Sequence, residues 1–220
     1  MMTTLRKTKQ LSPIGTRLKL LAAAGLIVLG STAPFGLPSA ANPSTDRPAR
    51  GTFLVATQEL QDSGFSETVV LLVQHDQFGT MGLIINQPSD VGLDIMLPDV
   101  GNLGGFNEKL YIGGPVATYG IILLVRSAAV PDDAEHVFGK VYVSGSRELL
   151  LQIINHGDAP SRVRLYAGHA GWSPGQLDRE ITRGSWQIMP ANESMIFADE
   201  PDKVWRKLAP RQRPMIVRAD

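Results

Sequence analysis

Four histidines and a scatter of hydroxyl and carboxyl groups are the side chains with which this sequence could do acid–base or nucleophilic chemistry. The histidines are His75, His136, His156 and His169. None belongs to the i, i+4 helical pair that binds zinc in metalloproteases, and the sequence has no cysteine to complete such a site. His75 and Asp76 are the most suggestive pair, because a carboxylate can orient an imidazole as a base. Adjacent residues of an extended chain point to opposite faces, however, so we expect a turn role for this pair.

A serine nucleophile would need a partner base and usually a Gly-x-Ser-x-Gly turn. The segment Val143-Ser144-Gly145 lacks the leading glycine, because Tyr142 occupies that position. The acidic pairs at 132–133 and 199–200 lie beside prolines, which is typical of solvated loop ends. The sequence therefore favours a non-enzymatic protein, with no catalytic residue, no metal site and no cofactor.

The segment Gly113-Gly114-Pro115, directly after an expected strand, is the best candidate for a small-molecule site. Consecutive glycines allow the backbone to form a nest whose N–H groups can hold an anion. The alternative, which we favour, is that the glycines make a tight bend where another backbone passes close by.

A second candidate combines Gly171 and Trp172 with the start of the following helix. Ser173 is expected as the N-cap, Pro174 as the first helical residue and Gln176 as the third, which together form a capping box. The N–H groups at a helix N-terminus can bind an anion, but Ser173 and Gln176 would already satisfy donors there. We favour structural capping. The predicted ligand-binding residues are thus Gly113, Gly114, Gly171, Trp172 and Gln176.

The N-terminal 41 residues have the order of a secretory signal peptide. A basic stretch is followed by a continuous apolar run over Leu20–Gly30, and Ser39-Ala40-Ala41 offers small residues for cleavage. The run is shorter than the ~20 residues of a spanning helix, although an uncleaved membrane anchor stays an alternative. We expect a periplasmic or inner-membrane-anchored protein that meets the membrane only through this segment. Residues 42–50 are proline-rich and are expected to form a linker.

Charge is distributed unevenly along the chain. Residues 1–41 hold five of the 21 basic residues and none of the 21 acidic ones, so residues 42–220 have a net charge of −5. Direct nucleic-acid binding is therefore not expected. Six basic residues lie between Lys203 and Arg218, and residues 211–220 form a basic tail. Contact with phosphate or lipid headgroups is one interpretation of this segment; we favour a solvated helix face and tail.

Two apolar, β-branched runs, Thr68–Gln74 and Met81–Asn86, flank a turn with Gly79 and predict a hairpin. Both runs are apolar at successive positions, so both faces should be covered. Further strands are expected at Phe53–Ala56, Leu110–Ile112, Ile121–Val125, Val141–Val143, Val163–Ala167 and Trp186–Met189. Helices are expected at Leu93–Leu97 (one turn), Glu148–Asn155 with Ser146 as N-cap, from Ser173 to Gly184, and at Pro201–Leu208. We predict one α+β domain over residues 51–210, with a mixed or antiparallel sheet, or a partly open barrel, flanked by helices.

Several ordered blocks resemble the YqgE/AlgH family of bacterial proteins. They include Gly51–Thr57, Met81–Asn86, Tyr111–Val116 and Ala170–Leu177, followed by Gly184-Ser185-Trp186. The resemblance implies a compact α+β fold. It implies no catalytic residues, and members of the family often carry the label of transcriptional regulator.

The chain departs from the family pattern at two places. Gln87 precedes Pro88 where the family usually has arginine, which removes an anion-pairing group, and the leader contrasts with the cytoplasmic location usual for the family. We expect a binding or regulatory protein whose partner is another protein or a small anionic ligand. The alternative is an enzyme or sensor that binds such a ligand at the Gly113–Gly114 turn.

Overall fold

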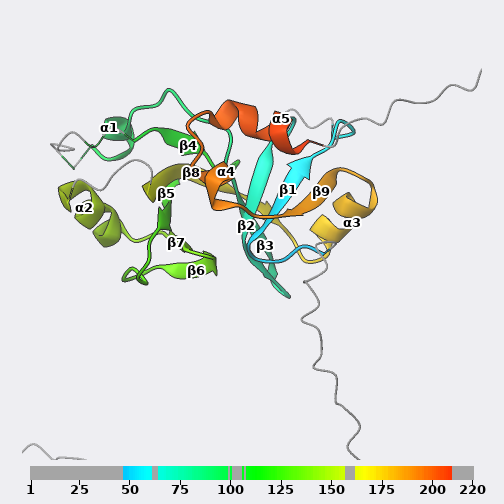
Figure 1. The fold of residues 1–220 in the computed structure, drawn as a ribbon, viewed down its shortest axis with the longest axis horizontal. Coiled ribbons are helices and arrows are strands. Elements are labelled where there is room, and N and C mark those ends of the chain that lie inside the picture. Colours follow the sequence, from blue (N-terminus) through cyan, green and yellow to red (C-terminus); the bar gives the residue numbers. More distant parts are fainter. Residues whose placement is uncertain are drawn as a thin grey trace, which may run out of the picture. The chain divides into compact units, whose positions relative to one another are not determined.

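The computed structural model describes residues 47–60, 64–98, 100, 106, 108–156 and 162–209. The expected leader (1–41) and basic tail (211–220) lie outside the described residues. Within the described part, nine strands form one sheet (Figure 1). The strands are β1 (Thr52–Ala56), β2 (Val69–Asp76), β3 (Gly79–Ile84), β4 (Leu110–Ile112), β5 (Val116–Arg126), β6 (Glu135–Phe138), β7 (Val141–Ser144), β8 (Val163–Trp172) and β9 (Trp186–Pro190). The helices are α1 (Leu93–Met96), α2 (Arg147–His156), α3 (Gln176–Thr182), α4 (Glu193–Ile196), the 3₁₀ turn η2 (Pro201–Lys203) and α5 (Val204–Leu208).

The sheet runs in the order β6-β7-β5-β8-β3-β2-β1-β9, and β4 joins it beside β8. All neighbours are antiparallel except β4 and β8, which are parallel. β8 is the strand shared by the two halves of the sheet, since its first part pairs with β5 and residues 170–172 pair with β3. A bulge in β2 between Leu72 and Gln74 bends the strand, and the sheet curls into a half-barrel. The α+β class with a partly open barrel is thus confirmed.

β2 is buried on both faces, as its successive apolar residues predict. Val69, Leu71 and Val73 face one cluster of core side chains, to which α4 contributes Ile196 and α5 contributes Val204. The alternate residues of β2 face a second cluster, which α3 and β9 cover. The hairpin is therefore central in the sheet and packed by helices on either side.

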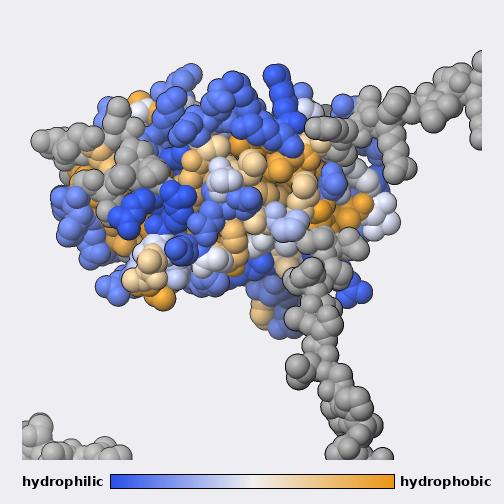
Figure 2. Space-filling view, viewed as in Figure 1, coloured by the Kyte–Doolittle hydropathy of each residue, from blue (hydrophilic) through white to orange (hydrophobic). Residues whose placement is uncertain are grey.

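The third apolar cluster lies where α1 and α2 cover β5 and β8. α2 begins after Ser146, whose Oγ accepts a hydrogen bond from the Leu149 N–H at 3.2 Å, so the predicted N-cap is confirmed. Figure 2 shows hydrophilic side chains along the outer side of α5 and hydrophobic ones beneath it. Every helix among the described residues is too short or too polar to span a bilayer.

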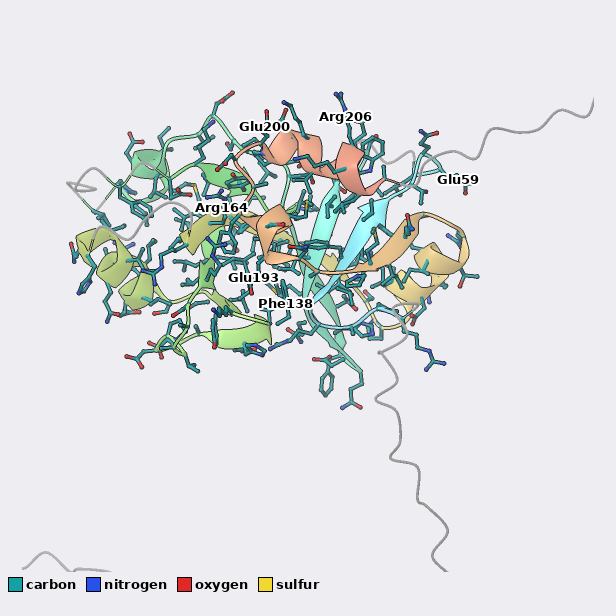
Figure 3. The ribbon with its side chains drawn as sticks, in the orientation of Figure 1. Glu59, Phe138, Arg164, Glu193, Glu200 and Arg206 are labelled. Atoms are coloured by element: carbon teal, nitrogen blue, oxygen red, sulfur yellow. The ribbon has the colours of Figure 1, made fainter. Side chains whose placement is uncertain are left out.

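Three local predictions need correction. α3 begins at Gln176, and its N-cap is Gly175 in the left-handed region (φ 71°), so Ser173 is not the N-cap and Pro174 is not helical. Half of the expected capping box exists, because the Gln176 Oε1 accepts from the Ser173 N–H at 3.1 Å. β8 continues past Ala167 to Trp172 because residues 170–172 pair with β3, and β5 starts at Val116, which pairs with His169 of β8. β6 and α4 were not expected; α4 lies beside the β6–β7 turn, where the Lys140 N–H donates to Glu193 Oε1 at 3.0 Å (Figure 3 labels Glu193).

A buried ion pair ties the loop before β4 to β8 and to the α4–α5 connection. The Arg164 guanidinium donates to Glu108 Oε2 at 3.0 Å and to the Ala198 carbonyl at 3.3 Å (Figure 3 labels Arg164). The side chains of Arg164 and Glu108 are only 8% and 5% exposed. Burial raises the pKa of the Glu108 carboxyl, while Arg164 opposes that rise. The pair fixes three segments that are distant in sequence.

Replacing Glu108 by glutamine removes the charge that neutralises Arg164 inside the protein. We expect Glu108→Gln to lower the free energy of unfolding by about 3–5 kcal/mol, the range seen when one partner of a buried pair is removed. The double variant Glu108→Leu/Arg164→Met should be clearly more stable than Glu108→Gln. Urea unfolding measures both, and equal losses in the two variants would contradict this account.

Candidate functional site

A cavity of about 540 Å³ lies beside the turn between β4 and β5, where the sequence places Gly113-Gly114-Pro115. Three other segments complete its wall: the turn before β2, the end of β3 and the chain that follows β3. The lining residues are Gly64, Phe65, Ile84, Gln87, Ile112, Gly114, Pro115 and Thr118. The volume falls within the range of ~300–1,000 Å³ that is typical of small-molecule sites.

The described lining residues carry no charge. Phe65, Ile84 and Ile112 give it an apolar surface, while the Gln87 amide and the Thr118 hydroxyl are its polar side chains. Ile112 is 46% exposed, and Val116 and Tyr119 of β5 are 44% and 87% exposed. An apolar surface thus extends from the cavity onto the start of β5, a combination that is more frequent at binding sites than on ordinary surface.

Gly113 and Gly114 are required by the close passage of the turn over β8. A Cβ on Gly113 would lie 2.2 Å from the Gly168 carbonyl oxygen, and one on Gly114 would lie 2.2 Å from the His169 carbonyl carbon. The Gly113 N–H donates to the Ala167 carbonyl at 2.9 Å, and the Gly113 carbonyl accepts from the Ile84 N–H at 2.9 Å. The peptide N–H of Gly113 is therefore engaged in a backbone bond and faces β8.

Trp172 and Gln176 belong to a separate cluster organised by Glu180 of α3. Glu180 Oε2 accepts from the indole N–H groups of Trp172 (2.8 Å) and Trp186 (2.9 Å), and Oε1 accepts from the Gln176 amide at 3.0 Å. The ring of Phe65 packs against both indoles, with centroids 6.3 and 5.9 Å away. These contacts fix α3 to the sheet and account for the polar atoms of both predicted residues. Phe65 connects this Glu180 cluster to the cavity.

Gly171 lies on the exposed side of β8, paired with Met81, and a Cβ there would meet nothing closer than Val116 Cγ2 at 3.8 Å. The structure thus separates the predicted site residues. Gly114 lines the cavity and Gly113 anchors its turn, whereas Trp172 and Gln176 lie in the Glu180 cluster.

His75 and Asp76 lie at the end of β2, next to the hairpin turn. The His75 Nδ1 is 2.8 Å from the Thr80 Oγ1, while Asp76 accepts from the Phe78 N–H at 2.7 Å. Hydrogen bonds from Gln74 and the Phe78 N–H lower the pKa of Asp76. The two side chains hence serve different partners, and Asp76 shapes the turn. Among the described residues, the structure gathers no three histidine, aspartate or glutamate side chains that could hold a metal ion.

Sequence reasoning missed most of the cavity wall. Phe65, Ile112 and Thr118 come from segments that pack together only in the folded chain, and nothing in their local sequence marks a site. Gln87 was noticed only as a departure from the family pattern. Its position in the wall keeps the described lining residues free of charge, where an arginine would introduce one.

These features can be compared with known proteins. Residues 53–216 match the model of the AlgH-like family, a domain of unknown function. A UPF0301 protein of Methylococcus capsulatus is 38% identical over 160 residues, covering 71% of this chain and 87% of that protein. A UPF0301 protein of Chlorobaculum parvum is 34% identical over 158 residues, covering 71% and 83%. The chain belongs to the AlgH-like family.

Two solved structures share the fold. The solution structure of the AlgH protein from Pseudomonas aeruginosa is 29% identical with a TM-score of 0.64, covering 78% of this chain and 90% of that one. A crystal structure from Corynebacterium diphtheriae is also 29% identical, with a TM-score of 0.62 and coverage of 77% and 90%. The resemblance to the YqgE/AlgH family is thereby confirmed. The names of these relatives state no biochemical activity.

Alanine substitution distinguishes Gly114, which touches the backbone of β8, from Gly171, which has room for a side chain. Gly114→Ala places a Cβ against the backbone of β8 at a residue with φ +150°, so we expect a loss of at least about 3 kcal/mol in unfolding free energy, or failure to fold. Gly171→Ala is the matched control on β8 and should change stability by no more than about 0.5 kcal/mol. Thermal and urea unfolding measure both. A well-tolerated alanine at position 114 would show that the turn is not packed as described.

The Glu180 cluster makes a separate prediction. Glu180→Ala leaves two buried indole N–H groups without an acceptor, which should cost about 3 kcal/mol of unfolding free energy. Glu180→Gln keeps a carbonyl oxygen that can accept from them and should cost clearly less. Urea unfolding followed by tryptophan fluorescence is the measurement. Equal stability of the alanine variant and the unmodified protein would be incompatible with a structural role for Glu180.

Proposed function

We propose that this member of the AlgH-like family is a non-enzymatic binding protein, and that the cavity beside Gly114 takes a small, uncharged and partly apolar molecule. The observation that carries the proposal is a cavity of about 540 Å³ whose described lining residues are uncharged and largely apolar. An apolar cavity with a few polar groups is the usual form of a small-molecule site. The Gln87 amide and the Thr118 hydroxyl would orient the ligand.

The lining favours a neutral ligand over the small anion considered from the sequence. An anion in this cavity would be removed from water, and the residues that the structure places in the wall offer it no cationic side chain, which is unfavourable. The Gly113 N–H, which an anion nest would use, already donates to the Ala167 carbonyl. Binding of a neutral molecule requires neither a cationic side chain nor a free Gly113 N–H.

The exposed apolar surface of Ile112, Val116 and Tyr119 adjoins the cavity and suits contact with another protein. A regulatory role would follow if a ligand in the cavity alters the conformation of this surface and with it the affinity for that protein. The label of transcriptional regulator is compatible with this mechanism if the contact with DNA is made by that partner. Export through the N-terminal leader stays a prediction, since residues 1–41 lie outside the described part, and so does the cytoplasmic alternative.

The test uses protein labelled at isoleucine methyl groups, with Ile84 and Ile112 as reporters in the cavity. A panel of small uncharged alcohols and amides, benzyl alcohol among them, should include members that shift these methyl signals saturably, while inorganic phosphate should not. Thr118→Trp fills the cavity and should weaken binding at least about tenfold, since the ligand's apolar contacts are lost. Thr182→Trp, at an exposed threonine of α3, is the matched control. The proposal fails if no neutral compound moves the two methyls, or if phosphate does.

A further inference from the structure

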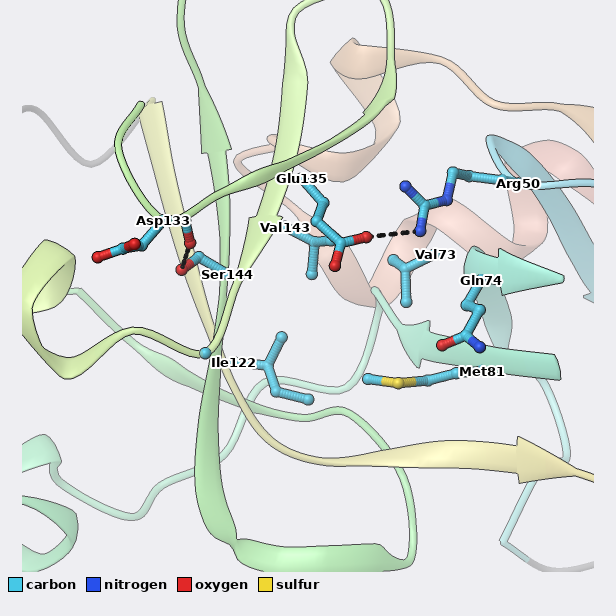
Figure 4. A pocket seen from close by; sticks show the side chains of 10 residues that line it. Arg50, Val73, Gln74, Met81, Ile122, Asp133, Glu135, Val143 and Ser144 are labelled. Carbon is cyan, nitrogen blue, oxygen red and sulfur yellow. Dashed lines mark hydrogen bonds and ion pairs between the residues drawn. The ribbon is translucent and has the colours of Figure 1, made fainter. Parts of the chain in front are cut away.

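A second cavity, of about 250 Å³, lies between the β2–β3 hairpin and the β5–β6–β7 part of the half-barrel (Figure 4). Its described lining residues are all different from those of the cavity at Gly114. Its wall is made by Arg50, Val73, Gln74, Met81, Ile122, Asp133, Glu135, Val143, Ser144 and Gly145. No local pattern in the sequence marks this cavity, because its lining residues come from segments scattered between positions 50 and 145.

The floor of this cavity is apolar and continuous with the main core. Val73 belongs to the core cluster, and Met81, Ile122 and Val143 pack against it. Figure 4 shows these four side chains gathered at the centre of the cavity, contributed by β2, β3, β5 and β7. A hydrocarbon group placed there would leave water and contact apolar side chains that pack against the core, which favours binding.

The mouth of the cavity holds one guanidinium group with an easily replaced partner. Arg50 donates to the His136 carbonyl at 2.8 Å and to Glu135 Oε2 at 2.8 Å. The side chain of Glu135 is 73% exposed, whereas that of Arg50 is 35% exposed. The carbonyl bond holds the guanidinium in place, while the carboxylate partner stands largely in water. An ion pair of this kind contributes little stability, so exchanging its carboxylate costs little.

We propose that this cavity binds a small monocarboxylate with a short apolar tail. The ligand carboxylate takes the place of Glu135 on Arg50, whose planar fork of N–H groups suits a carboxylate. The tail rests on the floor formed by Met81, Ile122 and Val143. The Glu135 side chain is 73% exposed and buries little apolar surface, so the burial of the tail favours the ligand over Glu135 as the partner of Arg50.

The remaining charges and the size of the cavity agree with this ligand class. Asp133 is the third charged residue of the wall, and Figure 4 shows its carboxylate directed away from the cavity, so it does not oppose an anion inside. A cationic ligand would have to pair with Glu135. That side chain is 73% exposed, so the ion pair would stay in water and contribute little to binding. A volume of 250 Å³ is just below the range of ~300–1,000 Å³ for drug-sized ligands, so the ligand is small.

The test compares hexanoate with hexanamide, a neutral molecule with the same tail, on the full chain. The Met81 and Ile122 methyl signals are the reporters. Hexanoate should shift them saturably and bind more tightly than hexanamide. Arg50→Gln should weaken hexanoate binding at least about tenfold, because a charge-assisted pair is lost. The affinity for hexanamide, which has no charge to pair with Arg50, should not change. Arg183→Gln, at an exposed arginine of the segment after α3, is the matched control and should change neither.

The direction in which Glu135→Gln changes hexanoate affinity tests whether the ligand replaces Glu135 on Arg50. Removing the competing carboxylate should strengthen hexanoate binding about two- to fivefold, the equivalent of an exposed ion pair, and should not affect hexanamide. Arg50→Lys keeps the charge and should retain part of the affinity, which guards against a folding defect in Arg50→Gln. The proposal is overturned if hexanoate does not bind, if hexanamide binds as tightly as hexanoate, or if Glu135→Gln leaves hexanoate affinity unchanged or lower. Thr118→Trp should have no effect, so this result is independent of the cavity at Gly114.

Discussion

The contact between the Gly113–Gly114 turn and β8 is the constraint on which the rest of the structure depends. β8 is the one strand that both halves of the described sheet share, and the turn crosses it at Gly168 and His169 with the two backbones touching. Side chains are excluded at the crossing, which explains the glycines without reference to a ligand. The Gly113 carbonyl and N–H then join β3 to β8, so the crossing fixes the parallel strand β4 and the wall of the adjoining cavity together.

The buried polar side chains with hydrogen-bonded partners lie where separate helices, strands and loops pack together. Arg164 and Glu108 connect β8, the loop before β4 and the α4–α5 connection, and Glu180 holds two indoles between α3 and the sheet. Groups of this kind are costly to bury unless they are paired, so their partners are fixed by the requirements of folding. Arg50 differs from them, because its carboxylate partner is mostly exposed and can be exchanged. This difference separates a structural ion pair from one that is available to a ligand.

The fold could be predicted from the sequence wherever an element carried its own apolar pattern. The β2–β3 hairpin shows this well, since two apolar runs around Gly79 specify both the turn and the burial of both faces. β6 and α4 have four residues each, two of them apolar, which is too short a pattern to predict, and β6 forms because the half-barrel offers it a partner in β7. The start of α3 was misplaced because a left-handed Gly175 takes the position expected for Ser173. The candidate sites were harder to predict for the same reason: Phe65, Gln87 and Thr118 meet only through tertiary packing, and of the predicted residues Gly114 alone lines the cavity.

Native-state hydrogen exchange of the Gly113 and Ile84 amides tests the central claim most directly. If the turn is packed against β8, both amide protons are held in backbone bonds, and they should exchange only through global unfolding, at the rate of the most protected amides of β2 and β8. Inorganic phosphate should leave their exchange and their chemical shifts unchanged. Fast exchange of the Gly113 amide, slowed when phosphate is added, would instead identify an open anion-binding nest and contradict the account.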